Sequence, residues 1–210
     1  MSQPPLRLYV DSLFTSPYAM SVFVALREKG LTFDTVPLDL DAGQNQSADY
    51  AQRSLTQRVP TLEHGDFTLS ESSAITEYLD QAYPQISVYP ADLQQRARAR
   101  QVQAWLRSDL LPIRQERSTL VVFCGQKMPP LSPVAQAAAR KLIGAAQVLL
   151  AGNPEHLFDE WSIADVDLAV MLNRLILNGD PVPAELVMYA QRQWQRPSVR
   201  EWVNLRRPVL

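Results

Sequence analysis

The sequence predicts a small α/β domain followed by an all-helical domain. Strand-like and helix-like segments occur in the order β-α-β and then β-β-α over about the first 85 residues. A proline-flanked stretch at residues 83–90 follows, and no convincing strand pattern appears after it. We therefore expect an α/β domain at residues 1–85, a linker at residues 84–90 and a helical domain at residues 91–210.

The β-α-β part begins with the apolar, strand-like run LRLYV at residues 6–10. A helix is predicted to start at Pro17, with Ser16 as its N-cap, and to stop at Gly30. Residues 33–40 alternate apolar and polar like a half-exposed strand, and their proline indicates an edge position.

The β-β-α part contains two short strands and one helix. Strands are predicted over residues 59–62 and 67–69, and the segment His64-Gly65-Asp66 between them is typical of a hairpin connection. Apolar residues then recur at helical spacing from Ser72, and Pro84 ends that helix.

The second half of the chain carries helical patterns throughout. The first of them is long and amphipathic, and Pro112 is expected to kink it. The third is apolar almost all round, as in a helix buried inside a bundle, and opens with a capping box of Ser162 and Asp165. The predicted helices cover residues 93–117, 134–150, 162–177, 183–194 and 198–205.

Composition excludes several classes of function. The net charge of −2 and the pI near 5.7 give no general electrostatic reason to bind nucleic acid or an anionic membrane. Cys124 is the only cysteine, so no intramolecular disulfide can form, and we expect it to be a buried, small apolar residue. His64 and His156 do not form a metal site with that thiol by spacing. With no long apolar run and no secretory signal pattern, a soluble cytoplasmic protein without a metal is expected.

Ser16 is the first candidate functional residue. The N-terminus of a helix has unpaired N–H groups and a partial positive charge, so it attracts anions. A hydroxyl at that point can donate a hydrogen bond to a bound anion, including a thiolate. Taken alone, however, Ser16 followed by Pro17 also fits a purely structural N-cap.

Three motifs in order resemble the glutathione transferase superfamily, in its bacterial branch nearest the serine-type theta and zeta classes. They are Ser16-Pro17-Tyr18 at the first helix, Val59-Pro60 before the third strand and Glu71-Ser72 before the third helix. The Ser162 and Asp165 box is similar to one in the central helix of that family's second domain. The resemblance implies a thioredoxin-like first domain, glutathione as co-substrate, a homodimer and a role in detoxification and oxidative-stress defence.

The first motif also suggests the chemistry. The segment Ser16-Pro17-Tyr18-Ala19 is similar to the Cys-Pro-Tyr-Cys of glutaredoxins with both sulfurs gone. The reactive sulfur must then arrive on the ligand, and a free cysteine thiol has a pKa of about 8.5. A hydrogen bond to a charged group contributes about 1.5–3 kcal/mol, or roughly one to two pKa units. Ser16 is thus predicted to stabilise the thiolate of glutathione rather than act as a nucleophile.

The resemblance assigns roles to the other motifs. It implies a cis peptide bond before Pro60, which lets the backbone of Val59 pair with the cysteinyl unit of glutathione like an added strand. Glu71 and Ser72 are expected to hold the γ-glutamyl group. The glycyl carboxylate is assigned to Arg58, with Gln57 as a lesser candidate. Trp105 and Phe123 are candidates for the second-substrate pocket, although aromatic residues at helical spacing are usually part of a core.

Several alternatives stay open. Tyr9, late in the first predicted strand, is a rival activator of the thiol, because other classes of the family use a tyrosine there. The arginine common five residues after the serine in zeta-type sequences is replaced by Ser21, which argues against the zeta-type isomerase reaction. The predicted function is transfer of glutathione to a small electrophile, with peroxidase activity toward organic hydroperoxides as an extension. The alternatives are a glutathione-dependent isomerase or disulfide-exchange enzyme, or a non-catalytic interaction protein.

Overall fold

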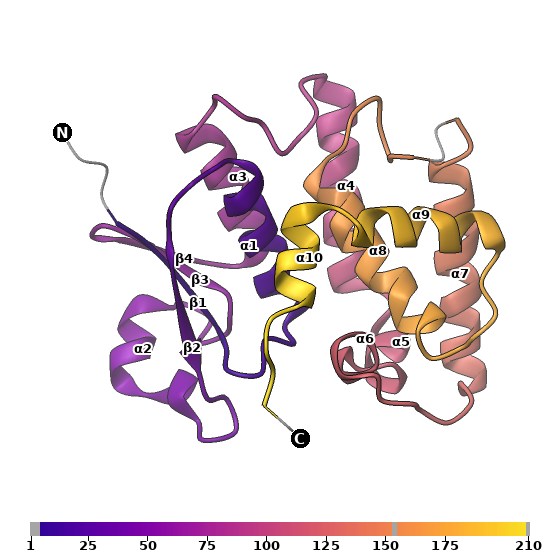
Figure 1. Cartoon of the computed structure of the whole chain (residues 1–210), viewed down its shortest axis with the longest axis horizontal. Coiled ribbons are helices and arrows are strands. Elements are labelled where there is room, and N and C mark those ends of the chain that lie inside the picture. Colours follow the sequence, from indigo (N-terminus) through magenta and orange to yellow (C-terminus); the bar gives the residue numbers. More distant parts are fainter. Residues whose placement is uncertain (1–4, 153–154, 209–210) are drawn as a thin grey trace. The chain divides into compact units, whose positions relative to one another are not determined.

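The computed structural model describes residues 5–152 and 155–208 of the 210-residue chain. Its contacts divide the chain into two compact units, whose elements are labelled in Figure 1. The first unit comprises Met1–Val88 and Glu201–Leu210, and the second comprises Tyr89–Arg200. By these contacts the end of the chain groups with the α/β unit, in contrast to the helical domain predicted for residues 91–210.

The first unit is built on a four-stranded sheet in the order β2-β1-β3-β4. Strands β1 and β2 are parallel, whereas β3 is antiparallel to both β1 and β4. The predicted β-α-β and β-β-α order is confirmed, with β2 at an edge. The elements are β1 (Leu6–Asp11), α1 (Pro17–Glu28), β2 (Asp34–Leu38), η1 (Gln44–Gln46), α2 (Ala48–Arg53), β3 (Thr61–His64), β4 (Phe67–Ser70) and α3 (Ser72–Ala82).

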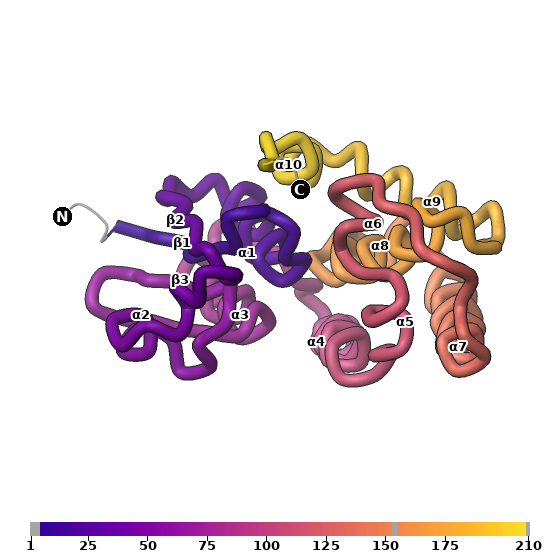
Figure 2. Tube along the Cα trace, turned by 90° about the horizontal axis from the view of Figure 1, so that it is seen from below, coloured from indigo at the N-terminus to yellow at the C-terminus, as the bar shows by residue number. Residues whose placement is uncertain are grey.

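Helices α1 and α3 pack together over one face of this sheet, and α2 lies on its other side (Figures 1 and 2). Helix α2 is tied to the sheet by Arg53, whose guanidinium pairs with the Glu63 carboxylate of β3 at 3.0 Å. Burial of apolar side chains between the sheet and its helices is the main stabilising contribution in such a layer. The fully buried side chains include Leu8, Val10, Val22, Leu26, Ile75 and Leu79.

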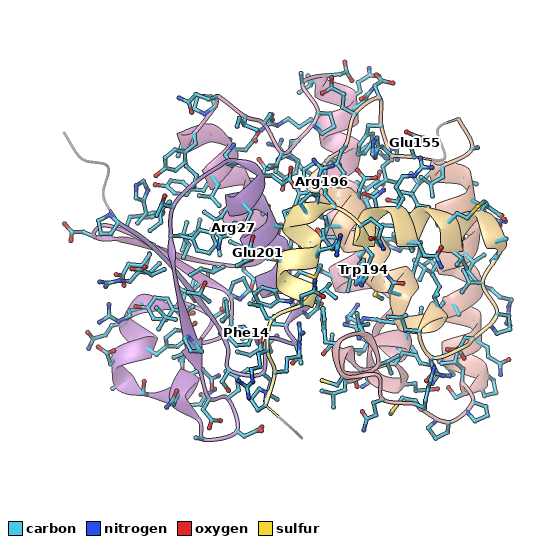
Figure 3. The ribbon with its side chains drawn as sticks, in the orientation of Figure 1. Phe14, Arg27, Glu155, Trp194, Arg196 and Glu201 are labelled. Carbon is cyan, nitrogen blue, oxygen red and sulfur yellow. The ribbon has the colours of Figure 1, made fainter. Side chains whose placement is uncertain are left out.

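Trp202, near the end of the described part of the chain, belongs to the core of the first unit. The Trp202 ring is fully buried and contacts the rings of Phe14 and Phe23, with centroid distances of 5.9 and 5.2 Å. Arg27 of α1 and Glu201 lie side by side in Figure 3 and form an ion pair at 2.6 Å. Sequence patterns could not show this grouping, because the contacting residues are far apart along the chain.

The helices of the second unit confirm most of the predicted segments and add a short one, α6. The capping box that opens α8 is also confirmed, and Asp165 in it is fully buried. No helix among the described residues is long and apolar enough to cross a membrane. The helices that follow β4 and α3 are α4 (Leu93–Ser108), α5 (Leu111–Glu116), α6 (Thr119–Cys124), α7 (Pro133–Leu149), α8 (Ile163–Ile176), α9 (Ala184–Trp194) and α10 (Pro197–Val203), the last of which extends into the first unit.

Two predictions for this region are wrong. The single helix kinked at Pro112 is instead two helices, because α4 ends at Ser108 and Leu110 takes a left-handed conformation with φ 58°. Pro112 then stands in the first turn of α5, where its missing N–H costs nothing. Cys124 is exposed rather than buried, since it is the last residue of the short helix α6.

Candidate functional site

The half-buried Ser16 lies at the N-terminus of α1, as the sequence predicts. It has extended backbone angles, and its Oγ accepts a hydrogen bond from the N–H of Ala19 at 3.2 Å. Within residues 5–152 and 155–208 the hydroxyl donates no hydrogen bond, so its proton is available to an acceptor. The side chain can therefore cap α1 and bind an anion at the same time.

Asp11, at the end of β1, fixes the loop that carries Ser16. Its buried carboxylate accepts the backbone N–H of Ser16 at 2.9 Å and that of Thr15 at 2.6 Å. It also accepts the Thr15 hydroxyl at 2.9 Å, so this neighbouring hydroxyl already has a partner. Sequence reasoning missed Asp11; an acidic residue four or five positions before a capped helix was the available signal.

The hydroxyl of Tyr9, the other candidate to activate a thiol, already donates a hydrogen bond within the protein. It donates to the Glu63 carboxylate at 3.0 Å, and Arg7 and Arg53 pair with the same carboxylate at 2.9 and 3.0 Å. Burial and, after it, the bond to Glu63 raise the pKa of Tyr9. This tyrosine therefore belongs to the charged cluster that joins α2 to the sheet, which favours Ser16 as the group that meets a bound sulfur.

The peptide bond between Val59 and Pro60 is cis, as the resemblance implied. The loop before it is held from two sides: the Gln57 carbonyl accepts the side-chain amide of Asn45 at 2.8 Å, and the Arg58 carbonyl accepts the Tyr50 hydroxyl at 2.9 Å. The Arg58 side chain itself is exposed. The positively charged Arg58 side chain thus lies in solvent next to Val59, on a backbone that these two hydrogen bonds hold in place.

Glu71 links β4 to α3 in an unusual backbone conformation. Its φ is 75° and its ψ is 111°, a region that residues with a Cβ rarely adopt. Its side chain is exposed, and its carbonyl accepts the N–H of Ile75 at 2.9 Å as the first bond of the helix. Ser72 follows as the first, buried residue of α3.

The sheet register brings the three motifs to one edge. Tyr9 of β1 pairs with Thr61 of β3, which pairs in turn with Ser70 of β4, so these three positions lie side by side across the sheet. Val59-Pro60 and Glu71-Ser72 adjoin β3 and β4 directly at this end, and Ser16 follows the end of β1 after a short loop. The motifs are Ser16 after β1, Val59-Pro60 before β3 and Glu71-Ser72 after β4.

Trp105 and Phe123 belong to the second unit. Trp105, on α4, donates its indole N–H to Asp109 at 3.0 Å and lines a cavity of about 550 Å³ beside α7. Phe123 lies on α6 and is not among the residues that line this cavity. Within the described part of the chain, no cluster of histidine, cysteine, aspartate and glutamate could hold a metal ion.

Comparison with known families accounts for nearly the whole chain. The family profile for the glutathione S-transferase N-terminal domain matches residues 5–81, and that for the C-terminal domain matches residues 92–207. The chain belongs to the glutathione S-transferase family. The predicted resemblance and the predicted fold class are thereby confirmed, since the mixed sheet and the helical unit are the two domains of this family.

Individual members of the glutathione S-transferase family are similar to this chain in sequence. Glutathione S-transferase theta-3 of Mus musculus is 35% identical over 149 residues, which are 69% of this chain and 60% of that protein. A zeta-class glutathione S-transferase of Euphorbia esula is 30% identical over 179 residues, 83% of this chain and 78% of that protein. The chain thus spans less than two thirds of the first relative and more than two thirds of the second.

A solved structure of the same family is more similar in sequence. A glutathione transferase homologue from Burkholderia GL BGR1, crystallised with bound glutathione, is 46% identical. It superimposes with a TM-score of 0.77, and the match covers 95% of this chain and 96% of that one.

Proposed function

We propose that this chain is a glutathione S-transferase that binds glutathione at the motif-bearing edge of its sheet. The observation that carries the proposal is the Ser16 hydroxyl, which caps α1 and keeps its proton available at the positive end of that helix. Glutathione bound to the Burkholderia homologue, at 46% identity, supports the choice of ligand.

In the proposed mechanism, Ser16 donates its proton in a hydrogen bond to the glutathione sulfur and favours its ionised form. Such a bond to a charged group contributes about 1.5–3 kcal/mol, which lowers a thiol pKa by roughly one to two units from about 8.5. The N-terminus of α1 adds to this stabilisation. Much of the bound thiol is then ionised near neutral pH.

Other groups at the same edge would hold the tripeptide. The backbone N–H and C=O of Val59 would pair with the cysteinyl unit, and Pro60 shapes the chain there. Arg58, with Gln57 as the weaker candidate, would bind the glycyl carboxylate. At the start of α3, Glu71 and Ser72 would bind the γ-glutamyl group, with the Glu71 carboxylate pairing with its ammonium.

Two reactions follow from one thiolate. In transfer, the sulfur attacks an electrophilic carbon, a carbon–sulfur bond forms and the leaving group departs with its electron pair. In peroxide reduction, the sulfur attacks the terminal oxygen, the O–O bond breaks, and the alkoxide leaves with the electron pair and takes a proton from solvent to become an alcohol. The sulfenic acid formed on sulfur then reacts with a second glutathione to give glutathione disulfide and water. A cytoplasmic homodimer acting in detoxification and oxidative-stress defence is part of this proposal.

Replacement of the candidate hydroxyl tests the proposal. In Ser16→Ala, we expect turnover of an aryl halide and of cumene hydroperoxide to fall about tenfold or more, and the pKa of bound glutathione to rise by roughly one to two units. Ser132→Ala is the control for loss of a capping serine, because Ser132 caps α7 by accepting the N–H of Ala135 at 3.3 Å, although its hydroxyl, unlike that of Ser16, also donates to the Glu116 carboxylate. A fall of less than about threefold in Ser16→Ala, with glutathione still bound, would contradict the proposed role.

The alternative functions use the same ligand or none. A glutathione-dependent isomerase or disulfide-exchange enzyme would turn over other members of a substrate panel. The zeta-type isomerase reaction is disfavoured, because Ser21, fully buried in α1, stands where zeta-type sequences carry arginine. A non-catalytic interaction protein would not be retained on immobilised glutathione.

A further inference from the structure

The C-terminal segment of the chain contacts the loop that carries Ser16. Phe14, two residues before the serine, has φ 51°, and its carbonyl oxygen accepts a hydrogen bond from the Arg207 guanidinium at 3.1 Å. These residues are 193 positions apart in sequence and belong to the same compact unit. The loop is therefore held by Asp11 at its ends and by Arg207 in its middle.

The Arg207 guanidinium is itself fixed in place. One terminal nitrogen donates to the carbonyl oxygens of Val203 and Leu205, at 2.7 and 3.1 Å. The other donates to the Trp202 carbonyl at 3.0 Å and to that of Phe14. The planar group thus ties the C-terminal end of α10 to the loop, which an ammonium with its single nitrogen cannot reproduce.

Side-chain packing supports the same connection. The buried Trp202 ring meets the Phe14 ring edge-on, with an interplanar angle of 83°, and also contacts Phe23 of α1. Figure 3 labels Phe14 beside the C-terminal segment, and labels the ion pair of Arg27 with Glu201 farther up the helices α1 and α10. The last described residues are therefore attached to the loop and to the helix whose N-terminus bears the serine.

We propose that Arg207 is a positioning residue for Ser16: through the Phe14 carbonyl it holds the loop where the serine hydroxyl meets the glutathione sulfur. The inference rests on the proposed function of Ser16 and adds the C-terminal segment to the site. A displacement of about 1 Å in a catalytic group can cost up to a hundredfold in rate, so a single bond on this short loop has kinetic consequences.

The test compares Arg207→Ala with Arg206→Ala. Arg206 is exposed, and its replacement by alanine removes the same positive charge from the same segment. In Arg207→Ala, we expect kcat/KM to fall about tenfold and the thiol pKa of bound glutathione to rise by about half a unit to one unit. The dissociation constant for glutathione should change less than about threefold, because the tripeptide contacts lie elsewhere. Arg206→Ala should match the wild type in all three measurements.

Two further variants keep the test decisive. Arg207→Lys retains the charge and most of the packing, so it should stay folded and still raise the thiol pKa. In a Ser16→Ala background, Arg207→Ala should change the thiol pKa no further, since it acts through the serine. Amide hydrogen exchange at residues 14–16 should be faster in Arg207→Ala than in Arg206→Ala.

The outcomes separate this inference from the proposed function. If Ser16→Ala raises the thiol pKa but neither Arg207 variant does, the positioning role is overturned and the function of Ser16 stands. An equal effect of Arg207→Ala with and without Ser16 would also overturn it. If Ser16→Ala itself leaves the thiol pKa unchanged, both proposals are overturned together.

Discussion

The carboxylate of Asp11 accepts the backbone N–H of Ser16 at 2.9 Å. The strand that ends at Asp11 thus sets where α1 begins, and with it the position of the candidate catalytic hydroxyl. Because the carboxylate is buried and accepts three hydrogen bonds from Thr15 and Ser16, it fixes the backbone of the loop and not one side chain alone.

Replacing this carboxylate should disturb both folding and catalysis. Asp11→Ala leaves half-buried donors of Thr15 and Ser16 without this partner, at a total cost of about 1–3 kcal/mol, and should lower kcat/KM roughly tenfold to a hundredfold. Urea unfolding and steady-state kinetics measure the two effects. Thr15→Val removes only the hydroxyl donor and should have the smaller effect on both; an equal or larger effect would contradict the role given to the backbone bonds.

Glu71 should show opposite effects on stability and binding. Glycine tolerates φ 75° without a Cβ clash, so Glu71→Gly should raise the free energy of unfolding by about 1 kcal/mol. The same change removes the proposed partner of the γ-glutamyl ammonium and should weaken glutathione binding about tenfold or more. Calorimetric titration and urea unfolding measure these quantities. Glu71→Ala should weaken binding without the gain in stability, and unchanged affinity in both variants would remove Glu71 from the site.

Asp165 should be among the costliest residues to replace in the helical unit. Its fully buried carboxylate accepts the N–H groups of Leu157 and Ser162 and the Tyr189 hydroxyl, each at 2.8 Å. Asp165→Ala leaves these donors unpaired, so we expect a loss of about 3 kcal/mol or more, measured by urea unfolding. The capping box alone predicts about 1 kcal/mol, which is the loss expected for the control Ser162→Ala. Equal losses in the two variants would show that the remaining bonds contribute little.

Protonation of Asp109 should make the helical unit less stable in acid. Hydrogen bonds from Lys141, then from the Leu110 N–H and the Trp105 indole, lower the pKa of this carboxyl from 3.8 to about 2. A carboxyl with a lowered folded pKa stabilises the fold above its unfolded pKa and loses that contribution as pH falls through the folded value. The stability of the wild type should therefore decrease between pH 3.8 and about 2, and Asp109→Asn should flatten that decrease.

Chemical unfolding at several pH values in this range measures the effect. The control is Glu160→Gln, which removes an exposed carboxyl that has no hydrogen bond among the described residues. If the free energy of unfolding of Asp109→Asn falls with pH as steeply as that of the wild type, the lowered pKa of Asp109 does not cause the loss of stability in acid.

The order of elements, the cap at Ser16, the hairpin and the capping box at Ser162 could all be predicted from the sequence. They depend on residues a few positions apart, where propensity, spacing and capping act directly. The same local reasoning failed at Pro112 and Cys124. Pro112 starts a new helix because Leu110 turns the chain, and nothing in the spacing of apolar residues shows such a turn.

The chemical groups that this protein offers can be read from the order of its amino acids: a serine hydroxyl at a helix start, a Val-Pro pair and a Glu-Ser pair. How these groups are positioned depends on contacts between distant segments of the folded chain. The register of β1, β3 and β4 puts the three motifs at one sheet edge, Glu63 engages Tyr9, and Arg207 reaches the Ser16 loop. Those relationships join residues distant in the chain, and they form only when burial of the apolar core brings the distant segments together.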